Sequence, residues 1–139
     1  MTYLLDTNIV SEWIKPQPAL GVIKWLAEAD EDRVFLSVVT LAELRYGIER
    51  MPDGERRRRL HVWLKDELPV RFEGRILPVD RPVAEAWGQL LARSRALGRT
   101  IAIMDGFLSA TAEVHQMTMV TRNVSDFSDL RHPIVNPWL

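Results

Sequence analysis

Tyr3-Leu4-Leu5-Asp6-Thr7-Asn8 is the stretch that decides the fold. Its large side chains lead directly into an aspartate, and a short apolar run of this kind predicts a strand buried on both faces of a sheet. Asp6, Thr7 and Asn8 then favour a turn and the first positions of a helix. A carboxylate is therefore expected at the carboxyl end of a strand, the edge where open α/β sheets bind ligands. Taken alone, Asp6 is equally well explained as a helix cap.

Strand-like and helical patterns alternate along the rest of the chain. Further short strands are predicted at residues 33–37, 75–79, 118–121 and 134–136. Helical periodicity covers residues 9–14, 19–29, 40–50, 55–68, 83–97 and 105–112. Pro78 favours an edge position for its strand, and Pro69 is expected to end the helix before it. The alternation predicts an α/β fold with a mainly parallel, short-stranded sheet that is covered by helices on both faces.

The composition narrows the class of protein. A length of 139 residues suits a single domain spanning 1–139. The chain has no cysteine, so disulfides and thiolate metal sites are excluded, and its three histidines are too scattered for a zinc site. No apolar run reaches the roughly 18–20 residues of a membrane span, and no signal peptide precedes the first strand. We therefore expect a cytoplasmic protein with no membrane partner.

Acidic residues are expected to converge at the carboxyl edge of the sheet. They follow the first, second and fourth strands or begin a nearby helix: Asp6, Glu43, Asp126 and Asp105. Carboxylates gathered in one cleft repel each other unless cations lie among them, and Mg²⁺ prefers such oxygen ligands. Metal-assisted hydrolysis of a phosphoester is the chemistry that such a site supports. Asp6 and Asp105 are the predicted metal ligands, and the predicted supporting residues are Thr7, Asn8, Thr121, Arg122 and Asn123.

Each of these acids also has a purely structural interpretation. Thr40 and Glu43 fit a capping box, in which a glutamate reaches back to the start of its own helix. Asp105 fits the cap of the helix that it begins, and Asp126 fits the cap of a turn at residues 127–130. These interpretations do not exclude a role in a site, so both remain open for each residue.

Two other charged features are kept apart from the predicted site. Asp80 also follows a strand, but Pro82 behind it marks an ordinary helix start. Four consecutive arginines at residues 56–59 cannot all face one way on a helix, so a solvated face is favoured over an RNA contact. Arg122 is better placed to hold a phosphate or a partner, because it directly follows a strand at the proposed edge.

Several motifs together resemble those of the PIN-domain ribonucleases, and especially the VapC/FitB-type toxins of bacterial toxin–antitoxin pairs. They lie at residues 4–8, 40–47, 104–105 with 110–112, 120–127 and 136–138. The resemblance extends over nearly the whole chain, and the acids of the family correspond to Asp6, Glu43, Asp105 and Asp126. Asn123 stands where many PIN domains carry an acid, so the fourth ligand is Asn123, Asp126 or both through water. Phe107-Leu108-Ser109 also replaces a common Ile-Ala, a difference in packing.

The resemblance implies more than the residues do alone. It implies an α/β/α sandwich, an endoribonuclease dependent on Mg²⁺ or Mn²⁺, an RNA substrate, a homodimer and inhibition by an antitoxin encoded beside it. The residues themselves predict the sheet, the acid cluster, the metal and the phosphoester chemistry. They do not by themselves predict the RNA substrate, the homodimer or the antitoxin.

Two other functions compete with this interpretation. A metal-dependent phosphatase of the haloacid-dehalogenase type also places an aspartate after its first strand, but it usually has a second acid two residues later, where this chain has Asn8. A catalytically inactive PIN module would bind RNA or protein without cutting it. The presence of all the candidate acids argues against such a module.

Overall fold

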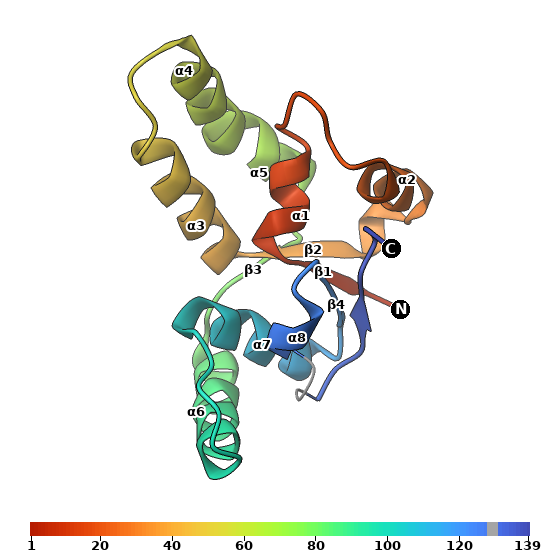
Figure 1. The fold of residues 1–139 in the computed structure, drawn as a ribbon, viewed down its shortest axis with the longest axis vertical. Coiled ribbons are helices and arrows are strands. Elements are labelled where there is room, and N and C mark those ends of the chain that lie inside the picture. The colour runs from red at the N-terminus through yellow and green to blue at the C-terminus, as the bar shows by residue number, and fades with distance from the viewer. Residues whose placement is uncertain (128–130) are drawn as a thin grey trace.

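The chain folds around a parallel five-stranded sheet with helices on both faces (Figure 1). The computed structural model describes residues 1–127 and 131–139. The strand order is β3-β2-β1-β4-β5. The strands are β1 (Tyr3–Leu5), β2 (Val34–Ser37), β3 (Ile76–Leu77), β4 (Thr118–Val120) and β5 (Ile134–Val135). The predicted α/β/α sandwich is confirmed, and the strand before Pro78 lies at an edge as expected.

The central strand β1 joins two hydrophobic cores. It pairs with β2 on one side and with β4 on the other, so that Leu4 lies between Phe35 and Met119. Leu4 and Leu5 are both fully buried. Because side chains alternate along a strand, Leu5 packs in the core on one face of the sheet and Leu4 in the core on the other. Burial on both faces, predicted from the apolar run, is confirmed.

Helices form a layer on each side of the sheet. One layer comprises α1 (Thr7–Glu12), α2 (Leu20–Glu28), α3 (Val38–Glu49), α4 (Glu55–Val62), the π-helical turn η2 (Trp63–Glu67) and α5 (Leu68–Arg71), with a short 3₁₀ turn η1 (Glu31–Arg33) before β2. The other layer comprises α6 (Arg81–Ala96), α7 (Ile103–His115) and α8 (Val124–Phe127). None of the helices in the described part of the chain has the length and apolar character needed to span a bilayer.

Pro69 does not end its helix, contrary to the prediction. The helix widens into the π turn η2, in which the N–H of Leu68 donates to the carbonyl of Trp63. Pro69 then falls in the first turn of α5, and the helix continues to Arg71. The change of helix type at η2 thus places Pro69 at the start of a new α-helical segment, a position where proline is tolerated.

Helices α6 and α7 approach each other closely at Gly106. A Cβ atom at this position would lie 2.5 Å from Nε1 and 2.8 Å from Cδ1 of Trp87 on α6. The indole cannot easily move away, since it stacks on Phe107 with ring centroids 5.0 Å apart. Gly106 is therefore a packing requirement of the layer that carries Asp105.

We expect Gly106→Ala to destabilise the protein by about 1–3 kcal/mol, because the added methyl group overpacks the contact with Trp87. Chemical denaturation would measure the change. Gly88→Ala on α6 is the matched control, since a Cβ there meets no atom within 4 Å. It should stabilise the helix by up to about 1 kcal/mol. Equal losses in the two variants would contradict this account of the packing.

Candidate active site

Asp6 is fixed at the end of β1 by both its backbone and its side chain. Its N–H donates to the carbonyl of Val120 at 2.9 Å, which extends the pairing with β4. One carboxylate oxygen, Oδ1, accepts from the Thr7 N–H at 2.7 Å and so caps α1. The other, Oδ2, accepts from the hydroxyl of Thr121 at 2.7 Å. The carboxylate therefore caps the helix and also lies at the predicted edge, with only 5% of the residue exposed.

Glu43 reaches the same edge from α3. The Thr7 hydroxyl donates to Oε1 of Glu43 at 2.6 Å. The capping-box interpretation of Glu43 is wrong, because α3 begins at Val38 and its cap is Ser37, whose Oγ accepts from the Val39 N–H at 3.0 Å. Ser37 is the last residue of β2 and already has the extended backbone that a cap requires.

Asp105 and Asp126 lie together in a cleft of about 360 Å³. Asp105 is in the first turn of α7, but it is not the cap, since Ala102 occupies that position. Asp126 is exposed on the short helix α8. The turn predicted at residues 127–130 lies, except for Phe127, outside the described residues. The structure thus brings Asp126 into the cleft beside Asp105.

The charges of the four acids act on one another. Burial, followed by the charges of Asp6, Asp126 and Glu43, raises the pKa of Asp105 to about 6. Burial also raises the pKa of Asp6, opposed by the hydrogen bonds from Thr121 and Thr7 and reinforced by the charge of Asp126. The pKa of Glu43 is raised by burial and by the charge of Asp6, against the hydrogen bond from Thr7. Asp6, Glu43 and Asp105 are therefore easier to protonate than they would be alone.

The donor atoms suit a hard divalent cation. In residues 1–127 and 131–139, no three Asp, Glu or His side chains form a group that is already arranged to hold a metal ion. Mg²⁺ does not require such a group, because it typically binds one or two carboxylates and completes its shell with water and substrate oxygen. Asp6 and Asp105, coupled by charge at this edge, fit that description.

The supporting residues predicted around the acids take different positions. Thr121 binds Asp6 and also accepts from the Asn123 N–H at 3.0 Å, while the Asn123 side chain is exposed. Arg122 lies over the Trp138 ring, with its Cζ 5.5 Å from the ring centroid. The Oδ1 atom of Asn8 is buried without a hydrogen-bond partner among the described residues.

The PIN domain family matches residues 3–132. The chain belongs to this family. It is 39% identical over 135 residues to toxin FitB of Neisseria gonorrhoeae, a match that covers 97% of each chain. It is 36% identical over 135 residues to VapC ribonuclease Y4jK of Sinorhizobium fredii, covering 97% of this chain and 96% of that one. The crystal structure of FitAcB from Neisseria gonorrhoeae superposes with a TM-score of 0.93 at 39% identity, over 99% of both chains.

This PIN domain is thus of the VapC/FitB type, as the motifs predicted. One wall of its acidic cleft was not predicted. Ser94, Arg99 and Thr100 line the cleft from the end of α6 and the connection to α7. The only local signal for them is Gly98, which marks the helix end just before Arg99 and Thr100.

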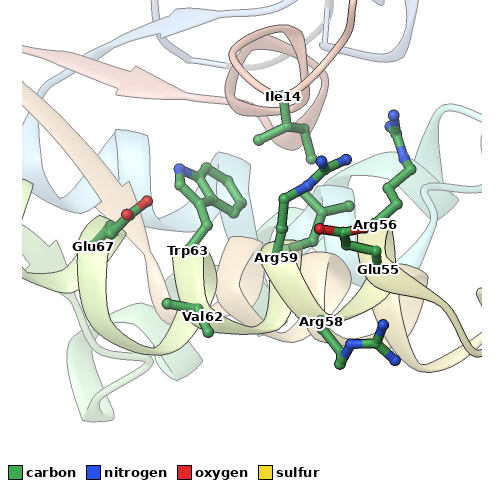
Figure 2. A pocket seen from close by; sticks show the side chains of 9 residues that line it. Ile14, Glu55, Arg56, Arg58, Arg59, Val62, Trp63 and Glu67 are labelled. Atoms are coloured by element: carbon green, nitrogen blue, oxygen red, sulfur yellow. The ribbon is translucent and has the colours of Figure 1, made fainter.

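The arginine run at residues 56–59 lies on α4, on the opposite side of the sheet from the helices that carry Asp105 and Asp126 (Figure 1). Arg57 is held by ion pairs with Asp53 and Glu49, each at 2.8 Å. The other arginines are exposed and border a separate hollow of about 600 Å³, together with Ile14 and Trp63 (Figure 2). None of the four candidate acids lines that hollow.

In the metal-free PIN domain, we expect Asp105→Asn to raise the melting temperature at pH about 7.5. The folded pKa of about 6 lies above the ordinary value of 3.8, so the folded state binds this proton more readily than the unfolded chain. Stability therefore falls as the pH rises from about 4 to about 6, and it stays lowered above that range. Asparagine carries no charge and should gain about 1 kcal/mol or less, since solvent screens this half-buried group.

Thermal unfolding in EDTA at two pH values tests this expectation. The advantage should vanish at pH about 4, where the aspartate is largely protonated in the folded state. Asp80→Asn is the control, because Asp80 caps α6 by accepting from the Val83 N–H and asparagine caps equally well. A gain of the same size at both pH values would show that charge repulsion is not the cause.

Proposed function

We propose that this PIN domain is a divalent-metal-dependent endoribonuclease that acts as the toxin of a toxin–antitoxin pair. The names of its relatives, among them a VapC ribonuclease, support the nuclease class. The observation that carries the proposal is the convergence of Asp6, Glu43, Asp105 and Asp126 at one edge of the sheet. Such a cluster binds cations, and a nuclease needs cations beside the phosphate that it attacks.

Asp6 and Asp105 would hold Mg²⁺, with Mn²⁺ as the alternative. When bound, the ion would activate a water molecule and neutralise charge on the attacked phosphate. Hydrogen bonds from Thr7 and Thr121 hold the Asp6 carboxylate in one orientation. Glu43 accepts from Thr7 through Oε1, which leaves Oε2 to accept a proton from the attacking water. Asp126 is the fourth acid, favoured over Asn123 because it lines the cleft with Asp105.

The partners of this chain are part of the same proposal. Solved complexes named FitAcB, FitAB bound to a DNA fragment and VapBC bound to promoter DNA support an antitoxin partner. RNA is the proposed substrate, and the homodimer implied by the resemblance stays a prediction. A basic side chain of an antitoxin laid against the cluster would satisfy the same charges as the metal, so the two would compete.

Cleavage of a mixed RNA pool in Mg²⁺ or Mn²⁺, with and without EDTA, tests the activity. Asp105→Asn keeps the side-chain shape but removes a charge from the cluster, and we expect it to lower the rate about 100-fold or more. Asp80→Asn should leave the rate nearly unchanged, since Asp80 serves as a helix cap. An active Asp105→Asn protein beside an inactive Asp80→Asn protein would place the site elsewhere. Metal-dependent binding without any cleavage would favour the inactive module.

Glu43→Gln separates chemistry from stability. The glutamine oxygen still accepts from Thr7, so the melting temperature should change little, whereas the loss of charge should lower cleavage about 100-fold. Glu49→Gln is the matched control on α3, because Glu49 is exposed and pairs with Arg45 and Arg57, away from the cluster. Full cleavage by Glu43→Gln would remove Glu43 from the proposed site.

A further inference from the structure

A second hollow lies next to the acidic cleft. It has a volume of about 420 Å³ and is lined by Leu91, Arg95, Gly98, Arg99 and Thr100. Arg99 and Thr100 also line the cleft that contains Asp105 and Asp126. The two spaces therefore share the wall formed by Arg99 and Thr100, with acids lining one space and Arg95 lining the other.

The turn that carries the shared wall is well defined. Gly98 takes a φ of +71°, the left-handed conformation that ends many helices. The Gly98 N–H donates to the carbonyl of Arg95 at 3.0 Å, and the Arg99 N–H donates to that of Ser94 at 2.8 Å. These bonds close the end of α6 in the manner of a Schellman motif. The backbone thus holds Arg99 and Thr100 at a fixed place beside the cleft.

Arg95 carries a charge that no described residue neutralises. Its side chain is exposed, and it makes no ion pair or hydrogen bond within residues 1–127 and 131–139. Arg93, two residues earlier on α6, pairs instead with Glu113 at 2.8 Å. Among the described residues, no acidic side chain lines the Arg95 hollow. An arginine in the last turn of α6 interacts favourably with the helix dipole. This interaction does not explain why Arg95 lines a hollow next to the acidic cleft.

The negative charge of the acidic cleft determines where a substrate strand can bind next to it. A substrate strand carries a phosphate on every nucleotide, and the acids repel each phosphate except the one beside the metal ion. Flanking phosphates therefore bind well only where cations lie next to the acids. Guanidinium groups suit this role, because their forked N–H donors match phosphate oxygens.

We propose that Arg95, Arg99 and Thr100 form a phosphate-binding subsite that holds single-stranded RNA next to the acidic cleft. This proposal rests on the proposed nuclease function. It identifies where the RNA strand passes out of the acidic cleft. Arg95 binds the backbone of a neighbouring nucleotide, next to the wall formed by Arg99 and Thr100, and it positions the strand without taking part in bond cleavage. The subsite recognises the charge of the phosphate group, so it contributes binding affinity with little preference for RNA sequence.

Binding is measured on full-length protein carrying Asp105→Asn, so that the RNA stays intact. The probe is a labelled pool of short, mixed-sequence, single-stranded RNA, titrated by fluorescence anisotropy at several salt concentrations in Mg²⁺. Arg95→Glu should weaken binding about ten-fold, and Arg95→Gln should reduce the slope of log affinity against log salt by about 0.7. Melting temperatures of both variants should stay close to that of the parent, and Arg95→Gln serves if Arg95→Glu does not fold.

Arg58→Glu is the matched control, since Arg58 is also exposed and unpaired among the described residues, and it points away from Ile14 in Figure 2. It should change RNA affinity by less than about two-fold, because it lies on α4, on the opposite side of the sheet from the helices that carry Asp105 and Asp126. Unchanged affinity in Arg95→Glu, or an equal loss in Arg58→Glu, would overturn the subsite.

With Asp105 restored, Arg95→Gln should raise KM and leave kcat unchanged. Cleavage that depends on Asp105 but ignores Arg95 refutes the subsite alone, and Arg95-dependent binding without cleavage refutes the nuclease alone.

Discussion

The pairing of β1 with strands on both sides is the constraint on which the rest of the structure depends. Three residues, Tyr3–Leu5, form the middle of the sheet and contribute to a hydrophobic core on each face. The ladder continues through the N–H of Asp6 to the carbonyl of Val120. A buried backbone thus sets the position of the first acid, and no loop movement is needed to bring it to the edge.

The acidic residues of the proposed site lower the stability of the folded protein. Burial and like charge both disfavour the ionised carboxylates, most clearly at Asp105. The chain offsets part of this cost with hydroxyl groups, because Thr121 donates to Asp6 and Thr7 donates to Glu43. Hydroxyls leave the negative charge in place, whereas lysine or arginine partners would cancel it. An edge that attracts cations from solution is the result.

Much of this arrangement was predictable because it is local or follows from a parallel sheet. An apolar run that ends at Asp6 predicts both the central strand and an acid at its carboxyl end. Other features depend on contacts between distant segments. Ser37, not Thr40, caps α3, because the last residue of β2 already has the extended backbone. The π turn before Pro69 and the cleft wall at Arg99 have no periodic pattern in the sequence from which they could be predicted.

The pairing of β1 with β4 also orders events during synthesis of the protein. Tyr3 is made more than one hundred residues before its partner on one side, Thr118. A contact between such distant segments closes late, because the intervening chain must fold or be held nearby first. Until β4 is in place, Asp6 lacks the Thr121 hydroxyl, and Asp126 has not joined the cleft. The acidic edge is therefore completed late, and a nascent chain that ends before β4 carries three of the four acids, Asp6, Glu43 and Asp105.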